Sequence, residues 1–424
     1  MNLKVWVIQD GEPIPGLDKD TRAWRSAMLC NALLDAGHEV LWWASTFDHA
    51  KKMHRFSSSC TVEMTSGIKI RLLHGPGYKQ NKSLKRFYHN QELAKIFAQE
   101  ILYIDKPDII FASIPTIELS EQAVKYGKRL HVPVLLDIRD AWPDHYLTLS
   151  PPSFRWILKL ILFYEFKRAL RTYKNASGLI AISETYIKWA LGYAQRNSNK
   201  FDAVFPMAYS DILLFLQRDE VFKRQYEFYI KYGIQKEDIV VSFIGSFTTS
   251  FDFYTIIEAI DILNNKYPNI AKILMVGDGP EYNNIRELSQ KKSNIIFTGW
   301  LDQISIRAIL KLSSVGIAPY KSDTYISLPN KPFEYMAAGL PLLSSLRGEL
   351  DDLIKKEQIG LKYRAGDSNS LVKQILWLAE HPEERISMGK RSRQLFEERY
   401  NADLIYPKLV EHLEFVASTY KKMK

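Results

Sequence analysis

Apolar runs and amphipathic stretches alternate along the chain. Short, continuous apolar runs rich in β-branched and aromatic residues are typical of strands that are buried on both faces of a sheet. In the first half, such runs cover residues 4–9, 39–45, 69–74, 108–113, 133–140 and 178–183. Stretches with helical periodicity, such as residues 21–37 and 82–105, separate them. This alternation predicts a doubly wound, mostly parallel α/β sheet.

The same pattern restarts in the second half. Strand-like runs cover residues 238–246, 271–279, 294–299, 315–320 and 340–345. We place the boundary near residues 203–211, which gives a domain 1–204 and a domain 205–395. The final segment, 396–424, is expected to be helical and to pack back on the first domain. Two Rossmann-like domains would then face each other across a cleft, where ligands meet the carboxyl ends of the strands.

Composition narrows the class of protein. The 424 residues are 46% hydrophobic and 25% charged, which is enough for two cores. Two cysteines, Cys30 and Cys60, are too few for a disulfide framework and favour a reducing compartment. The first residues do not resemble a signal peptide, and no apolar run reaches transmembrane length, so a cytoplasmic location is expected.

The net charge of +9 suits nucleic acid, anionic lipid or a phosphate-bearing substrate, and it is also compatible with a role in solubility alone. The chain has no arginine-rich recognition helix and no aromatic pair of the RNA-binding type, so we expect no nucleic-acid partner.

Candidate chemistry centres on "PNKPFEYMAAG", residues 329–339. Asn330 is a suitable N-cap, Lys331 and a proline open the helix, and Glu334 lies one turn further on. A helix start with a lysine favours a phosphate, and a carboxylate behind it can accept hydrogen bonds from a ribose diol. The alternative is a capped helix with a solvated glutamate.

Three strand-end turns of the second domain add candidate donor contacts. Gly245 is followed by the hydroxyls of Ser246, Thr248 and Thr249, and Gly279 lies in "VGDGPEY". Trp300 follows another strand-end glycine and is placed to meet a base. The alternatives are ordinary turns and a half-buried tryptophan.

The ordered set "GSF…IIEA", "VGDGPE", "FTGW", "IAPY" and "PNKPFEYMAAGLPLL" resembles the donor-binding domain of the family 4 glycosyltransferases. Residues 11–49, 107–118 and 132–144 are similar to a subgroup that acts in surface-polysaccharide assembly. The resemblance runs nearly end to end. It implies a GT-B fold and a retaining, metal-independent transfer from a nucleotide diphosphate sugar, with UDP or GDP as the nucleotide and no cofactor.

The resemblance assigns roles to several positions. Glu334 matches the glutamate that holds the ribose, whereas its usual partner position is Ile326. The arginine and lysine that clamp the diphosphate in relatives are replaced by Ser246 and Phe251. Lys331 is the local substitute, with Arg139 or Arg22 reaching across the cleft.

In the first domain, Asp140 matches the aspartate of a His-Asp pair that many relatives carry, and Arg139 stands where they have the histidine. Gly16 lies where relatives use glycine to let backbone amides meet the donor phosphate. Asp140 would orient the acceptor, or simply cap a turn. Arg22 and Arg25 are three residues apart on one helix face and would bind a phosphate-bearing acceptor, or form a solvated face. The sequence has no Asp-x-Asp motif flanked by apolar strand residues, which would be expected to bind a metal ion. No metal is therefore expected.

Residues 151–176 combine aromatic, aliphatic and basic residues. Such a helix suits an anionic membrane surface, and its alternative is a helix packed on the sheet with a basic outer edge. We therefore expect a peripheral protein on the inner face of the cell membrane with a lipid-diphosphate-linked saccharide acceptor. Two other interpretations stay open: a nucleotide-sugar 2-epimerase, which needs no acceptor, and a non-catalytic nucleotide-sugar binder.

Overall fold

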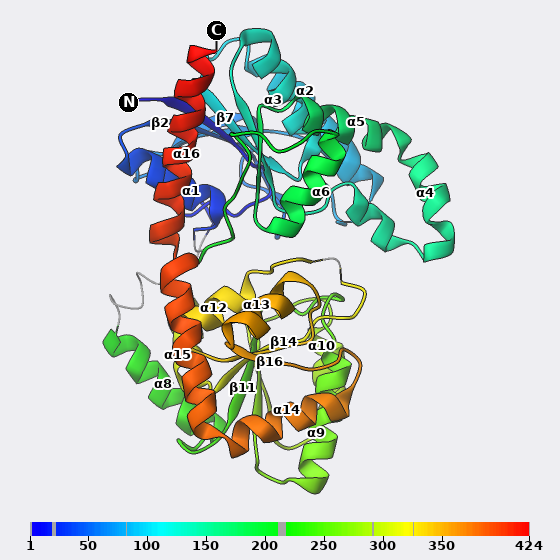
Figure 1. Ribbon diagram of the computed structural model, residues 1–424, viewed down its shortest axis with the longest axis vertical. Coiled ribbons are helices and arrows are strands. Elements are labelled where there is room, and N and C mark those ends of the chain that lie inside the picture. Colours follow the sequence, from blue (N-terminus) through cyan, green and yellow to red (C-terminus); the bar gives the residue numbers. More distant parts are fainter. Residues whose placement is uncertain are drawn as a thin grey trace. The chain divides into compact units, whose positions relative to one another are not determined.

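A computed structural model of the chain describes residues 2–18, 23–81, 83–210, 218–290, 292–324 and 326–423. They form two compact units, Met1–Pro206 with Ile405–Lys424, and Met207–Leu404. Each unit has helices packed around its own largely parallel sheet (Figure 1). The predicted pair of Rossmann-like α/β folds is therefore confirmed.

The main sheet of the first unit is built from the apolar runs that the pattern predicts. Its strands are β1 (Lys4–Ile8), β2 (Glu39–Ser45), β5 (Cys60–Glu63), β6 (Lys69–Leu73), β7 (Ile109–Ile114), β8 (Val134–Ile138), β9 (Gly178–Ala181) and β10 (Ala203–Val204). Their order is β10-β9-β8-β7-β1-β2-β6-β5, and only the β5–β6 pair is antiparallel within the described residues. The order of connection reverses between β1 and β7. Their carboxyl ends therefore form the switch point at which α/β sheets bind ligands.

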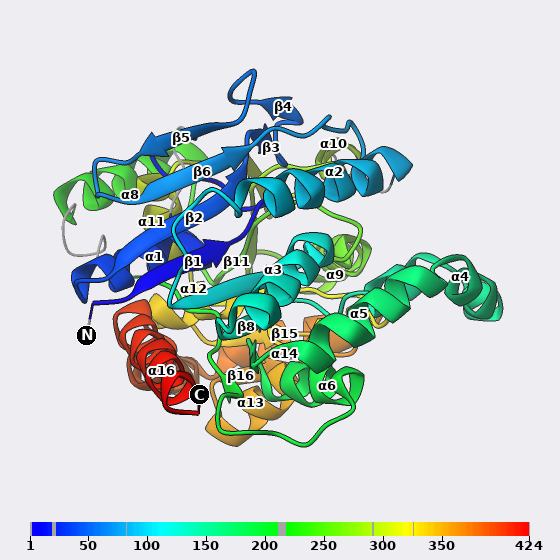
Figure 2. The ribbon, with the colours of Figure 1, turned by 90° about the horizontal axis from the view of Figure 1, so that it is seen from above.

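Helices cover both faces of this sheet (Figure 2). They are α1 (Arg25–Asp35), α2 (Leu84–Glu100), α3 (Ile117–Leu130), α5 (Phe163–Asn175) and α6 (Glu184–Ala194). A small hairpin of β3 (Phe47–Asp48) and β4 (Met53–His54) follows β2. The last helix, α16 (Ala402–Lys422), joins this unit from Ile405 onward. Its Lys421 pairs with Asp108 at 2.7 Å, which ties the end of the chain to the start of β7.

The predicted helix over residues 151–176 is not continuous. It is divided into a short turn at Pro152–Phe154, α4 (Arg155–Ile161) and α5, with the break at Leu162. Residues of α5 such as Ala169 and Tyr173 are buried against the unit, whereas no residue of α4 is buried. In Figures 1 and 2, α4 stands away from the other elements of the first unit. We call residues 154–164, which run from the end of the short turn through α4 to the start of α5, the arm.

The second unit has a fully parallel sheet. Its strands are β11 (Val240–Ile244), β12 (Lys272–Val276), β13 (Ile295–Gly299), β14 (Val315–Ala318), β15 (Leu342–Ser344) and β16 (Gly360–Lys362). Their order, β13-β12-β11-β14-β15-β16, is the doubly wound order of dinucleotide-binding folds. The switch point lies between the carboxyl ends of β11 and β14.

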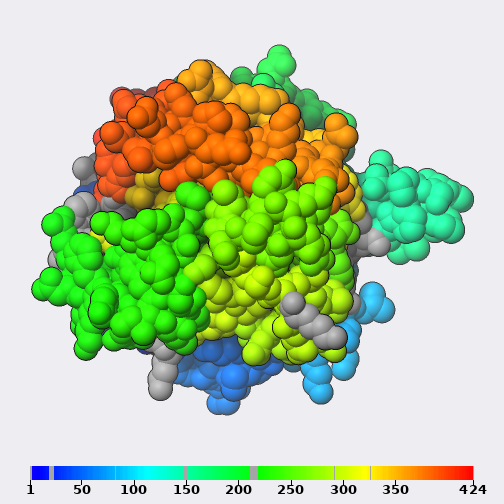
Figure 3. Space-filling model, turned by 90° about the horizontal axis from the view of Figure 1, so that it is seen from below, coloured from blue at the N-terminus to red at the C-terminus, as the bar shows by residue number. Residues whose placement is uncertain are grey.

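Eight helices with described bounds surround this sheet. They are α8 (Arg218–Tyr232), α9 (Phe253–Lys266), α10 (Tyr282–Leu288), α11 (Gln303–Leu312), α12 (Lys331–Ala337), α13 (Glu349–Glu357), α14 (Ser368–Glu380) and α15 (Pro382–Arg399). In Figure 3, α14 (orange) lies beside α9 (yellow-green) on one face of the unit. None of the helices in the described part of the chain is both long enough and apolar enough to cross a bilayer.

Candidate functional site

Lys331 and Gly245 meet at the switch point of the second unit. Gly245 directly follows β11 and has a φ of +149°, which disfavours residues with a side chain. A Cβ atom built on Gly245 would lie 1.7 Å from the Nζ atom of Lys331. The ammonium group also lies 5.3 Å from the centre of the Phe243 ring and 5.0 Å from that of Phe251. Two aromatic rings and a missing side chain therefore place this cation at the end of the central strand.

Tyr335 fixes α12, and with it Lys331 and Glu334, against the sheet. Its hydroxyl group accepts a hydrogen bond from the Ile244 amide at 3.0 Å and donates one to the Ile317 carbonyl at 3.2 Å. Its ring packs on Gly316, where a Cβ atom would come within 2.3 Å. Glu334 is buried beside it, with 7% of its surface exposed. The helix therefore presents the lysine and the glutamate from a rigid position.

The glycine turns of the second unit leave no room for side chains. A Cβ atom on Gly277 would lie 2.1 Å from the Gly245 carbonyl oxygen, and one on Gly279 would lie 2.6 Å from the Phe247 amide. The Phe247 amide donates to the Asp278 carbonyl at 2.9 Å, which joins the turns after β11 and β12. These contacts explain the glycines by packing of the turns on each other, so a contact between Gly279 and a ligand stays a prediction.

The remaining predicted donor residues differ in exposure. Ser246 and Thr249 are exposed and Thr248 is half-buried, all in the loop that follows β11. Trp300 is 63% exposed, so the alternative of a half-buried tryptophan is wrong. Asn330 precedes α12, but its side chain makes no capping hydrogen bond, and the predicted side-chain cap is therefore absent. The helix itself has only seven residues, so Lys331 is a stronger source of positive charge than the helix dipole.

In the first unit, Arg25 and Arg139 belong to a buried ion network. Arg25 donates to both carboxylate oxygens of Asp137, with its Nη2 atom 2.9 Å from Oδ1, and its side chain is 0% exposed. Arg139 pairs with Asp137 and with Glu12, and its Nη2 atom donates to Ser26 at 2.9 Å. Burial acts to raise the pKa of Asp137, but the two guanidinium groups outweigh it and hold the pKa below its usual value.

This network corrects the expectation for Arg25 and gives Arg139 a structural role. Arg25 has neither a solvated face nor access to an acceptor, because its guanidinium group is enclosed with Asp137 and the Pro206 carbonyl. Arg139 is held by two carboxylates inside its own unit, which accounts for its charge without a ligand. Arg22, the other predicted acceptor residue, lies outside the described residues.

Asp140 and Gly16 occupy loops of the first unit. The Asp140 carboxylate accepts a hydrogen bond from the Ala141 amide at 2.8 Å, as in the turn-capping alternative. Burial raises the pKa of Asp140, and His145, 3.7 Å away, acts in the opposite direction. Gly16 has a φ of +88°, and a Cβ atom there would lie 2.5 Å from the end of Met64.

The switch point of the first unit also contains two residues that the sequence analysis missed. Asp10 follows β1 and Thr116 follows β7, and the Thr116 hydroxyl donates to Asp10 at 2.7 Å. The signal was a polar residue two positions after the end of each central strand. Among the described residues, no cluster of three or more His, Cys, Asp or Glu side chains is arranged to hold a metal ion.

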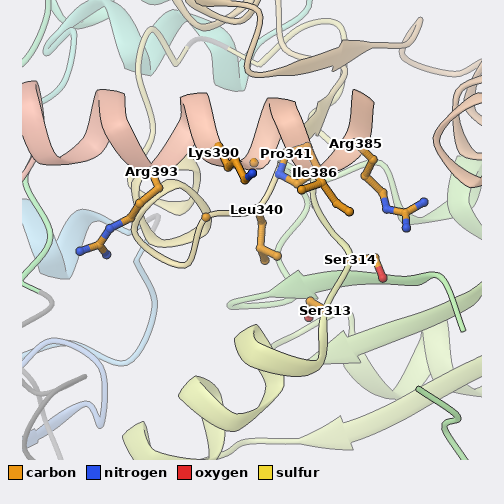
Figure 4. A pocket seen from close by; sticks show the side chains of 10 residues that line it. Ser313, Ser314, Leu340, Pro341, Arg385, Ile386, Lys390 and Arg393 are labelled. Carbon is orange, nitrogen blue, oxygen red and sulfur yellow. The ribbon is translucent and has the colours of Figure 1, made fainter. Parts of the chain in front are cut away.

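A separate cavity of about 380 Å³ lies in the second unit (Figure 4). It is bordered by Ser313 and Ser314 before β14, by Leu340 and Pro341 before β15, and by α15. The two serines and the Leu340–Pro341 pair lie at the amino ends of β14 and β15. The cavity is therefore at the opposite edge of the sheet from Gly245 and Lys331.

Residues 238–381 match the model of the family described as glycosyl transferases group 1. The second unit resembles the group 1 glycosyltransferases. A curated relative is the chitobiosyldiphosphodolichol beta-mannosyltransferase of Candida glabrata, which is 24% identical over 161 residues. That match covers 36% of this chain and 35% of the mannosyltransferase, so the chain spans about a third of that relative's length.

Solved structures resemble the chain over nearly its whole length. Sucrose-phosphate synthase from Thermosynechococcus elongatus has a TM-score of 0.74 at 16% identity, and the match covers 98% of this chain and 99% of that one. Anabaena HepE in complex with UDP has a TM-score of 0.67 at 15% identity and covers 98% and 100%. The likeness of these folds confirms the GT-B class for the two units.

Proposed function

We propose that the protein is a retaining, metal-independent glycosyltransferase that takes a sugar from a nucleotide diphosphate sugar. The observation that carries the proposal is the position of Lys331 beside Gly245 at the switch point, with Glu334 one helical turn further on. Lys331 would bind the diphosphate and Glu334 the ribose diol. The HepE structure contains UDP, which supports UDP as the donor nucleotide here.

The chemistry demands positive charge where the diphosphate leaves. In this proposal, Lys331 supplies it in place of the missing arginine and lysine at positions 246 and 251. The aromatic rings of Phe243 and Phe251 lie about the ammonium group and reduce its contact with water. A charge fixed in advance in an apolar surrounding stabilises a developing anion more than a hydrated one does.

We infer that the acceptor is a lipid-diphosphate-linked saccharide at an anionic membrane surface, in the synthesis of a cell-surface polysaccharide. The arm supports this, because Trp156, Leu160 and Ile161 are 63%, 66% and 70% exposed. Residues 151–164 contain no acid, and Arg155 and Lys159 lie among the apolar side chains. Exposed apolar side chains interspersed with cations suit an interface with anionic lipid. The name of the Candida relative also includes the word diphosphodolichol, which denotes a lipid that carries a diphosphate.

A panel of nucleotide sugars tests the donor assignment by thermal shift. A true donor at 100 times its dissociation constant is expected to stabilise the protein by about 2.7 kcal/mol. Glu334→Gln should abolish this shift, whereas Glu258→Gln, an exposed carboxylate on α9, should preserve it. A shift that survives Glu334→Gln removes the glutamate from the ribose site. Product formed from the donor alone would favour the epimerase.

A further inference from the structure

Two cations of the first unit lie over the same aromatic ring. The Nζ atom of Lys52 is 5.0 Å from the centre of the Tyr78 ring, and the Cζ atom of Arg86 is 5.8 Å from it. Lys52 lies in the β3–β4 hairpin that follows β2, Tyr78 follows β6, and Arg86 is in the first turn of α2 (Figure 2). All three therefore come from the carboxyl edge of the sheet, where α/β folds bind ligands.

The polar contacts of the two cations go to neutral oxygen atoms. Lys52 donates to the His49 carbonyl and to the side-chain oxygen of Asn81, and Arg86 donates to the Asn81 carbonyl at 3.2 Å. Within the described part of the chain, neither cation forms an ion pair. Asp48, which acts on Lys52 from a distance, lies 3.7 Å from both Lys51 and Arg55. The cations therefore converge on one residue without a carboxylate between them.

This arrangement has an electrostatic cost. Burial lowers the pKa of Lys52, and the charge of Arg86 lowers it further. Like charges held close together repel each other, and an anion bound between them would attract both cations and offset that repulsion. The Tyr78 ring is itself held in place, because its hydroxyl group is hydrogen-bonded to His49.

The start of α2 adds positive potential of the same sign. Ser83 caps this 17-residue helix by accepting a hydrogen bond from the Arg86 amide at 3.2 Å. The first turn contains Lys85 and Arg86 and no acidic residue. Helix starts normally favour acids, so a basic first turn gives up a stabilising interaction with the helix dipole. Together with the cation pair, it makes this edge of the sheet strongly attractive to an anion.

We propose that Lys52 and Arg86 bind a phosphate group of the acceptor substrate. This inference rests on the proposed function and assigns the acceptor to the first unit, which also carries the arm. Arginine and lysine form short, charge-assisted hydrogen bonds to phosphate oxygens, and a phosphate carries enough charge to offset both cations. The acceptor sugar would then extend from the cation pair toward Asp10 and Thr116 at the switch point of the same unit.

Titration of the full chain with inorganic pyrophosphate, followed by calorimetry, tests the site. The titration uses the Lys331→Gln background, so that the proposed donor site does not contribute. Lys52→Gln and Arg86→Gln are each expected to weaken binding roughly tenfold or more. Lys85→Gln removes an exposed charge from the same helical turn and is the matched control, and Arg86→Lys keeps the charge. Circular dichroism checks that each variant is folded.

Equal binding by the parent and a folded Lys52→Gln/Arg86→Gln double variant would overturn the assignment. An equal loss in Lys85→Gln would also overturn it, because the attraction would then be diffuse. Vesicles of phosphatidylcholine with and without phosphatidic acid identify the source of the phosphate. Binding to phosphatidic acid that depends on Lys52 and Arg86 points to a lipid phosphate, and dependence seen with pyrophosphate alone points to a soluble one. If the wild-type protein binds the donor but the Lys331→Gln protein does not bind pyrophosphate, this site is refuted and the glycosyltransferase assignment remains intact.

Discussion

Gly245 gives Lys331 its position, because the ammonium group occupies the space that a side chain at residue 245 would fill. A Cβ atom at that point would lie 1.7 Å from Nζ and 2.5 Å from Cε of the lysine. The two residues are far apart in the sequence and belong to different elements, the end of β11 and the start of α12. The packing of the strand end against the helix start therefore fixes the position of the cation at the switch point.

Gly245→Ala is expected to displace Lys331 and to abolish donor binding. The overall stability should fall by only about 1–2 kcal/mol, because a flexible lysine can move away and the main cost is the strained φ of the new alanine. Thermal shift with the donor and urea unfolding measure the two effects separately. Gly192→Ala is the control, since a Cβ atom there meets nothing within 4 Å. Normal donor binding by Gly245→Ala would contradict the role of Lys331.

Asp137→Asn should destabilise the first unit by about 3–5 kcal/mol, because the buried guanidinium group of Arg25 would lose its carboxylate partner and Arg139 would keep Glu12 alone of its two. Urea unfolding at neutral pH measures this change. Asp105→Asn is the control, because Asp105 pairs with Lys4 at an exposed site, where an ion pair contributes little. A change below 1 kcal/mol for Asp137→Asn would show that the network is not structural and would remove this explanation of the Arg139 side chain.

Glu118→Gln should stabilise the protein more as the pH rises from 5 to 8. Burial raises the pKa of Glu118 to about 8, and the charge of Glu165 contributes to this rise. The Oε2 atom of Glu118 is buried and has no hydrogen-bond partner among the described residues. Between the ordinary pKa of a glutamate and 8, the folded state holds a proton that the unfolded state releases. The wild-type protein therefore loses up to about 1.4 kcal/mol of stability per pH unit in this window.

Urea unfolding at pH 5 and pH 8 compares Glu118→Gln with the wild type. The difference in stability should be small at pH 5 and should grow toward pH 8. Glu220→Gln, which changes an exposed residue of α8, should give the same difference at both values. A constant difference for Glu118→Gln would mean that the buried carboxyl group does not keep its proton.

The apolar pattern predicted most of the fold because a strand buried on both faces appears in the sequence as a continuous apolar run. The run at residues 39–45 coincides with β2. The antiparallel strand β5 was missed because it is short and alternates in exposure at the edge of the sheet. The break at Leu162 could not be predicted either, since neither proline nor glycine marks it.

The candidate site was only partly predictable for a related reason. Local motifs identify Lys331 and Glu334, because capping and spacing act within one helical turn. The burial of Arg25 depends on Asp137, which is 112 residues away, and the sequence has no local sign of that pair. Likewise, the approach of Lys331 to Gly245 is set by the packing of α12 through Tyr335.

We expect the arm to bind the protein to anionic membranes. Replacing Trp156 and Leu160 by serine is expected to weaken binding to anionic vesicles by at least about tenfold, because each side chain would bury its apolar surface in the lipid interface. Stability should hardly change, since both residues are exposed and contribute little to the core. Co-sedimentation with vesicles of increasing anionic lipid content measures the effect.

Leu102→Ser/Tyr103→Ser is the matched control, because these residues lie outside the arm and are 56% and 89% exposed. Equal losses in both double variants would show that apolar exposure in general drives binding, and the arm would then have no special role.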